Sequence, residues 1–115
     1  MSYRKYSNRK TVVDGITFDS KAEAKRYKEL VTLEKLGAIT DLELQPEFLL
    51  QEKFKIAGKT EREIKYIADF KYFDKSKNKM VVEDVKGCRT EVFNVKRKIF
   101  LYRYGEQFEF LLTGR

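Results

Sequence analysis

The sequence predicts a mixed α/β domain in which two helices lie on the faces of a central β-sheet. Two observations support this fold class. First, the hydrophobic pattern changes between strand and helix periods, in the order hairpin, helix, three strands, helix and strand. Second, the chain has 115 residues, of which 42% are hydrophobic and 14% aromatic. A chain of this size and composition can bury one core and is too short for two domains.

The N-terminal part of the chain is expected to form a flexible basic arm, a short hairpin and a helix. We place the arm at residues 1–10 and a single folded domain at residues 11–115. An Asp-Gly pair suits the two-residue turn of a hairpin at residues 11–18. The helix is expected at residues 20–36, because Ser20 is a good N-cap residue and a glycine follows the last turn.

A strand-rich region follows, and a second helix precedes the last strand. Pro46 interrupts the first strand, and the charged segment at residues 55–62 is expected to be a turn. Tyr66 is expected to pack in the core on one face of a long strand. Thr90 and Gly105 suit the two ends of the second helix. The expected elements are strands at Ile39–Leu44, Glu47–Gln51, 63–73 and 79–86, a helix at 90–104 and a strand through 108–112.

The absence of histidine and the single cysteine exclude several classes of chemistry. Without histidine the chain has no Ser–His–Asp or Cys–His catalysis. With Cys88 as its one cysteine it has no internal disulfide and no ordinary zinc site. Any metal must therefore be held by oxygen ligands, which favours Mg²⁺ or Mn²⁺ on carboxylates.

The charge of the chain points to an anionic partner. Lysine and arginine number 25 against 18 acidic residues, which gives a net charge of +7. Four of these positive charges lie in the arm, on Arg4, Lys5, Arg9 and Lys10, with no acidic residue among them. Two interleaved tyrosines could stack on bases, so the arm is a candidate phosphate clamp, although a merely solvated terminus is the alternative. Charge alone does not distinguish DNA from RNA.

No feature of the sequence indicates a membrane protein. No apolar run approaches the roughly 20 residues of a membrane-spanning helix. The basic N-terminus also lacks the apolar segment of a signal peptide. We therefore expect a soluble cytoplasmic protein.

Two aspartates and a lysine on adjacent strands are the first candidates for a catalytic site. Asp69 lies within the strand at residues 63–73. Asp84 and Lys86 share one face at the end of the next strand, whereas Glu83 points to the other face. Aspartate is disfavoured in strands, and two neighbouring carboxylates repel each other unless a cation lies between them. A divalent metal would relieve that repulsion and act on a phosphodiester; a salt-bridged pair is the alternative.

Glu23 is a further candidate because it lies inside the apolar stripe of the first helix. Its helical angle is close to those of Tyr27 and Leu30. A buried carboxylate is costly unless it is paired or binds a metal. The competing interpretation is a capping box, in which Glu23 hydrogen-bonds back to Ser20. Both roles can hold together.

Lys96 and Gln45 could support such a site. Lys96 falls within the expected apolar arc of the second helix, which is formed by Val92, Val95, Ile99 and Phe100. It either contacts a phosphate or extends its charge to water past packed neighbours. Gln45 precedes the proline of the first strand, where it either orients a water or phosphate or is a polar edge residue.

The order and context of these motifs resemble the PD-(D/E)XK nuclease superfamily. Within it, the sequence is most similar to a small phage and prophage family of unknown function. The resemblance covers roughly residues 11–112. The runs that carry it are FDSKAE at 18–23, LQP at 44–46, YIADF at 66–70 and VEDVKG at 82–87.

The resemblance implies a restriction-endonuclease-like αβββαβ core and a set of site residues. The implied catalytic residues are Glu23, Asp69, Asp84 and Lys86, with Lys96 and Gln45 in support. Asp69 and Asp84 would hold Mg²⁺ or Mn²⁺, and Lys86 would assist the attacking water. Glu23 would join through a water or as a further ligand. The proline that often precedes the first aspartate of the family motif is replaced here by Ala68.

These observations predict a metal-dependent DNA endonuclease. By analogy with similar small phage proteins, the substrate would be a branched recombination or replication intermediate in a bacterial host cell. Symmetric cleavage of two strands would require a homodimer. The alternatives are a non-catalytic nucleic-acid-binding protein on the same fold and a phage protein that acts through protein contacts.

Overall fold

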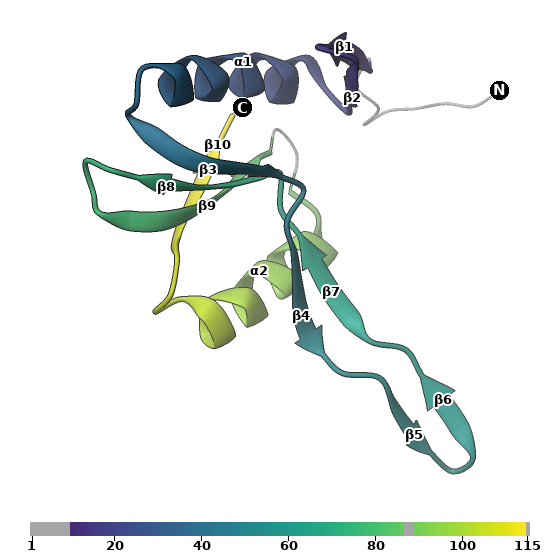
Figure 1. Ribbon diagram of the computed structural model, residues 1–115. Helices are drawn as coiled ribbons and strands as arrows, with labels where there is room; N and C mark the ends of the chain where they lie inside the picture. The colour runs from purple at the N-terminus through teal and green to yellow at the C-terminus, as the bar shows by residue number, and fades with distance from the viewer. Residues whose placement is uncertain (1–9, 87–88, 115) are drawn as a thin grey trace, which may run out of the picture.

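The computed structural model describes residues 10–86 and 89–114 and has the mixed α/β architecture that the sequence predicts. A four-stranded sheet has the order β10-β9-β8-β3, with β9 and β10 parallel and the other pairs antiparallel. Helices α1 and α2 lie on opposite faces of it (Figure 1). Neither helix in the described residues is long and apolar enough to cross a membrane. The bounds are β3 Ile39–Leu44, β8 Phe70–Asp74, β9 Lys79–Val85, β10 Glu109–Thr113, α1 Lys21–Lys35 and α2 Glu91–Tyr104.

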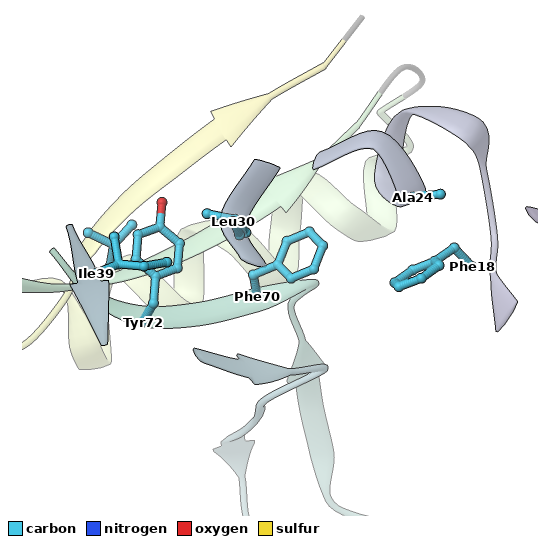
Figure 2. Close-up of a cluster of buried hydrophobic side chains, with 7 residues drawn as sticks. Phe18, Ala24, Leu30, Ile39, Phe70 and Tyr72 are labelled. Carbon is cyan, nitrogen blue, oxygen red and sulfur yellow. The ribbon is translucent and has the colours of Figure 1, made fainter. Parts of the chain in front are cut away.

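Two hydrophobic clusters hold the helices on the sheet. The first lies between α1 and the sheet, where Leu30 of α1 packs over Phe70 and Tyr72 (Figure 2). The second lies on the α2 side, where Phe93 and Phe100 of the helix pack with residues of the main sheet and of the segments 48–50 and 66–68. The remaining buried members are Phe18, Ala24, Ile39 and Val81 in the first cluster and Phe48, Leu50, Tyr66, Ala68 and Val82 in the second.

The predicted hairpin and both helix starts are confirmed. Strands β1 (Thr11–Val13) and β2 (Ile16–Phe18) pair antiparallel around Asp14 and Gly15, which both have positive φ. Positive φ at both central residues is the geometry that an Asp-Gly turn supplies. Ser20 caps α1, since its Oγ accepts a hydrogen bond from the Glu23 amide at 3.1 Å. The hydroxyl of Thr90 caps α2 in the same way.

The prediction of one continuous strand at residues 63–73 is wrong. Strand β7 (Ile64–Ile67) ends before Ala68, and β8 begins after Asp69. The preceding strand bends at the same level, because Gln45 has a φ of 51° and its amide bonds to the carbonyl of Asp69. Strand β7 therefore leaves the main sheet and pairs with β4 (Glu47–Gln51). As a result Tyr66 packs on the α2 side, whereas Phe70 packs under α1.

The segment predicted as a turn at residues 55–62 contains a second hairpin. Strands β5 (Phe54–Ile56) and β6 (Lys59–Glu61) pair antiparallel around Ala57 and Gly58. We refer to residues 51–64 as the hairpin extension. It continues the β4–β7 ribbon away from the main sheet, on the side where α2 lies (Figure 1).

The expected apolar arc of α2 is wrong for two of its residues. Val92 and Val95 are 64% and 57% exposed, whereas Phe93 and Phe100 are buried. The sequence of α2 has apolar residues on two adjoining stripes, so periodicity alone does not decide which stripe faces inward. The packing of α2 against β4 and β7 selects the phenylalanine stripe.

Candidate active site

The chain bends between β3 and β4 and again between β7 and β8, and these two bends bring the candidate acidic residues together. Asp69 lies at the break between β7 and β8, and its amide bonds to the carbonyl of Glu83 in β9. Asp84 follows in the same strand, close to its end. The backbone break just before β8, at the end of the main sheet, thus places Asp69 beside the end of β9.

Asp84 is fully buried and its two carboxylate oxygens have different environments. The hydroxyl of Tyr66 donates a hydrogen bond to Oδ2. Oδ1 is buried with no hydrogen-bond partner. The nearest cation is Lys86, whose Nζ lies 3.6 Å from Oδ1 and 5.1 Å from the centre of the Phe93 ring. A buried carboxylate oxygen without a hydrogen-bond donor is unfavourable unless something else neutralises it.

Asp69 lies next to this carboxylate, and its pKa is strongly raised. Its Oδ2 accepts a hydrogen bond of 2.8 Å from the amide of Val85. Burial, and next the neighbouring Asp84, raise the pKa of Asp69 to about 8. Two neighbouring buried carboxylates cannot both be charged at low cost without a cation. The raised pKa shows that the pair favours a shared proton in the metal-free protein, a position that a cation could also take.

Glu23 joins the two aspartates from α1 and also belongs to the helix cap. It is only 6% exposed. Burial raises its pKa, the charges of Asp19 and Asp84 raise it further, and a backbone hydrogen bond from Asp19 partly offsets these effects. Glu23 and Asp69 line one cavity of about 160 Å³ together with Gln45. At the helix cap the amide of Glu23 donates to Ser20, whereas its carboxylate has a backbone hydrogen bond at Asp19, so the predicted bond back to Ser20 is not found among the described residues.

The oxygen donors at this place fit a hard divalent cation held by two carboxylates. Within residues 10–86 and 89–114, no group of three or more acidic or cysteine side chains is arranged to hold a metal. Mg²⁺, however, commonly binds one or two carboxylates and keeps several water ligands. Oδ1 of Asp84, which forms an ion pair with Lys86 but accepts no hydrogen bond, and the adjoining Asp69 supply such a pair. The nearby cavity has room for water.

The supporting candidates are placed unequally. Gln45 is exposed, lines the cavity beside Asp69 and is tied to it through the backbone. Lys96 is half-buried on α2. No hydrogen bond or ion pair within the described part of the chain joins Lys96 to Asp69 or Asp84. The structure therefore brings Gln45 to the site and does not show a contact for Lys96.

The N-terminal arm falls almost entirely outside the described residues. Arg4, Lys5 and Arg9 are among the residues that the structure does not describe. Lys10 is exposed and forms an ion pair with Asp19, with a distance of 3.0 Å between Nζ and Oδ1. The expected phosphate-binding role of the arm remains a prediction.

Sequence reasoning missed the role of Tyr66. The prediction that it packs in the core is confirmed, since it is 3% exposed and lies against Phe93 and Phe100. Its hydroxyl nevertheless binds Asp84, and burial and that carboxylate raise its pKa strongly. The positive charge of Arg97 acts in the opposite direction. The available signal was a tyrosine rather than a phenylalanine at a core position, because a buried hydroxyl needs a partner.

A second buried carboxylate lies on the opposite face of β9. Glu83 is fully buried. It points toward α1, on the face opposite to Asp84, as the alternation along the strand requires. Arg26 donates two hydrogen bonds to it, of 2.6 and 3.1 Å. The hydroxyls of Tyr72 and Thr113 donate two more, of 2.6 and 2.9 Å. Glu83 is thus fully satisfied within the protein, in contrast to Asp84.

The stability of the metal-free protein should fall as the pH rises. The pKa of Asp69 is about 8 in the folded chain and 3.8 in the absence of structure. The folded state therefore holds this proton more tightly, and the stabilisation is complete below about pH 4 and is lost up to about pH 8. Urea unfolding in EDTA should show a decreasing free energy of unfolding from about pH 5 to 8.

The absence of histidine makes this a clean measurement, because few other side chains titrate in that range. Asp69→Asn should flatten the dependence. Mg²⁺ should raise the stability most at the alkaline end, where Asp69 is charged. A free energy of unfolding that stays level or rises over this range in wild-type protein would contradict the paired-carboxylate interpretation.

One family model matches this chain. The model, described as "Protein of unknown function (DUF1064)", covers residues 3–112. No curated protein and no solved structure has a significant match. The matched range includes every candidate residue of the site, and its description names no activity.

Proposed function

This chain belongs to the DUF1064 family, and we propose that it is a metal-dependent endonuclease that hydrolyses phosphodiester bonds in DNA. One observation supports the proposal above the others. Asp84 presents a buried oxygen without a hydrogen-bond partner to a site that also contains a second perturbed carboxylate and a lysine. Glu83, one residue earlier on the other face of the strand, accepts hydrogen bonds on both of its carboxylate oxygens, whereas Oδ1 of Asp84 has only the ion pair with Lys86.

Each residue has a distinct task in the proposed reaction. Asp69 and Asp84 would hold Mg²⁺ or Mn²⁺. When bound, such an ion supplies Lewis acidity toward a phosphate oxygen and makes water a better nucleophile at neutral pH. The side chain of Lys86 is 33% exposed and its ammonium forms an ion pair with the buried Asp84, so it could orient the attacking water and stabilise charge on the phosphate.

Tyr66 and Glu23 complete the proposed machinery. The hydroxyl of Tyr66 donates a hydrogen bond to one oxygen of Asp84, which leaves the other oxygen with the ion pair to Lys86 and no hydrogen bond. Glu23 and Asp69 line the cavity in which water can lie. The resemblance of the motif order to PD-(D/E)XK nucleases implies a role for Glu23 beside Asp69, Asp84 and Lys86, whereas the part given to Tyr66 rests on its hydrogen bond alone.

The proposed substrate is branched DNA. The net charge of +7 favours a polyanion. The preference for branched recombination or replication intermediates follows from the resemblance to small phage proteins.

A cleavage panel tests the proposal. Labelled four-way junction, flap, linear duplex and single strand would be incubated with the full chain in Mg²⁺, in Mn²⁺ and in EDTA. We expect cleavage only with metal, and fastest on the branched substrates. Folded protein that binds these DNAs but cuts none of them would favour the second candidate, a non-catalytic DNA-binding protein. The ion pair between Lys86 and Asp84, which compensates the charge of Asp84 without a metal, is the observation that favours that candidate.

A further inference from the structure

The positive charge of the chain beyond the N-terminal arm is concentrated on α2 and the hairpin extension. Helix α2 has four basic residues and one acidic residue, a charge of +3, and the extension has four basic and three acidic residues, a charge of +1. The rest of the chain after the arm, residues 11–50, 65–90 and 105–115, has a charge of −1. Within the described part of the chain, none of these eight basic residues forms an ion pair. The surface therefore attracts a polyanion.

The same surface is also apolar and contains a groove. Among the described residues, eleven large hydrophobic side chains are exposed, and nine of them lie on the β4–β7 ribbon, the extension and α2. The groove has a volume of about 470 Å³ and lies between the extension and α2. Phe54, which is 44% exposed, and Ile99 contribute apolar walls. Lys53 and Arg103 give its lining two positive charges, against one negative charge from Glu52. A ligand that fits this groove offers apolar surface as well as negative charge.

Helix α2 leads from the candidate active site to this groove. The centre of the Phe93 ring, in the first turn of α2, lies 5.1 Å from Nζ of Lys86. Lys96, Ile99 and Arg103 follow at spacings of three and four residues, so they share one face of the helix. Phe93 and Arg103 are about 15 Å apart along the helix axis. A DNA strand bound at the candidate site can therefore continue along α2 into the groove.

Unpaired nucleotides have the combination of properties that the groove requires. Each nucleotide offers a negative phosphate and the apolar face of a base, which stacks on aromatic side chains. In duplex DNA the base faces are stacked on one another inside the helix, so a duplex offers the groove mainly charge. An acidic protein segment would offer both properties, but the continuity of the groove with the candidate site for DNA favours a nucleic acid.

We propose that the groove between the hairpin extension and α2 binds a single-stranded segment of DNA. A base stacks on Phe54. The neighbouring phosphates contact Lys53, Lys96 and Arg103. In a branched substrate this segment is an unpaired strand next to the scissile bond. The inference rests on the proposed function for the identity of the ligand as DNA, but binding is measured without metal and does not require cleavage.

Three DNA ligands, compared on the full chain in EDTA, test the nature of the ligand. They are a fluorescent oligo(dT) of about 16 nucleotides, a duplex of the same length, and the same oligomer with an abasic sugar at every position. Fluorescence anisotropy at about 150 mM salt should give a dissociation constant for oligo(dT) at least about tenfold lower than for the other two. The abasic oligomer keeps the phosphates and lacks only the bases, so it separates stacking from charge.

Substitutions of Phe54 test the stacking contact. Phe54→Ala should weaken the binding of oligo(dT) by about tenfold or more and leave the binding of the abasic oligomer unchanged, because only a base–aromatic contact is lost. Phe54→Tyr keeps an aromatic ring and should bind oligo(dT) within about twofold of wild type. Leu36→Ala shortens an exposed apolar side chain outside this surface and should have no effect. Circular dichroism would check that each variant is folded.

Substitutions of the basic residues at the groove test the phosphate contacts. Lys53→Gln with Arg103→Gln should reduce the slope of the logarithm of the association constant against the logarithm of salt concentration by about 1.4, since each phosphate contact of a single strand contributes about 0.7. Lys28→Gln with Lys35→Gln removes the same charge from exposed positions of α1 and should leave the slope unchanged. The N-terminal arm is the same in every variant, so the differences report this surface.

Three results would overturn the proposal. These are binding of the duplex or the abasic oligomer as tightly as oligo(dT), wild-type affinity in Phe54→Ala, and a salt slope that Lys53→Gln with Arg103→Gln does not change. Metal-dependent cleavage together with any of these results would leave the proposed nuclease without this groove. Single-strand binding as expected, in a chain that cuts no DNA, would support the groove and reject the nuclease.

Discussion

Asp84→Asn should reduce metal-dependent DNA cleavage by about three orders of magnitude or more, equivalent to about 4 kcal/mol of transition-state stabilisation. The amide keeps the size of the side chain and can still accept the hydrogen bond from Tyr66. The substitution removes the negative charge of Asp84, and with it the anionic oxygen without a hydrogen bond that the proposed cation requires. Cleavage rates on the best substrate of the panel, and Mn²⁺ binding by calorimetry, would measure the loss.

The same substitution should leave the metal-free protein at least as stable as wild type. Burial, the largest cause of the raised pKa of Asp69, remains in this variant, but the repulsion from the Asp84 charge that adds to it disappears. Asp41→Asn is the matched control, because Asp41 is an exposed residue of the same sheet with a φ of 59°, which asparagine tolerates. Cleavage by Asp84→Asn within tenfold of the control would remove Asp84 from the site, and a large loss of metal-free stability would assign it a structural role.

Arg26→Met should destabilise the fold by about 3–5 kcal/mol at neutral pH, because it leaves the buried carboxylate of Glu83 without its counter-charge. The two hydrogen bonds from Arg26 are lost, and only the neutral hydroxyls of Tyr72 and Thr113 remain. For a chain of this length the melting temperature should fall by about 15 °C or more. Scanning calorimetry and urea unfolding would measure both quantities.

Two further variants distinguish charge burial from loss of packing. Adding Glu83→Gln to Arg26→Met should recover part of the stability, since the unpaired charge is then removed. Lys25→Met makes a similar change at the neighbouring exposed position of α1 and should have an effect within about 0.5 kcal/mol. If the double variant is no more stable than Arg26→Met alone, the cost lies in packing between α1 and the sheet and not in the buried charge.

Local signals in the sequence were sufficient for most secondary structure. Ser20 and Thr90 begin the two helices as expected, because a hydroxyl that caps the first amides acts within one turn. The Asp-Gly turn of the first hairpin is also a local choice of backbone conformation. The alternation around Glu83 and Asp84 correctly placed them on opposite faces of a strand, since that period is a property of the extended backbone.

Tertiary structure decided where the chain leaves the main sheet and which surfaces are buried. The break at Asp69 depends on hydrogen bonds to Gln45 and Glu83, which are distant in sequence. The inward stripe of α2 depends on β4 and β7, which are also distant. The partners of Tyr66 and Glu83 could not be read from spacing, because a buried polar group is satisfied by whichever donor or acceptor the fold brings near it.

The sequence by itself thus determined the helices, the turns, most strands and the acidic residues from which a site could be built. Only the tertiary structure decided that one oxygen of Asp84 accepts no hydrogen bond, while Glu83, one residue earlier, accepts four. The physical reason is that propensity and periodicity act within a few residues. Desolvation and hydrogen-bond satisfaction depend instead on side chains that meet only when the sheet and helices have packed.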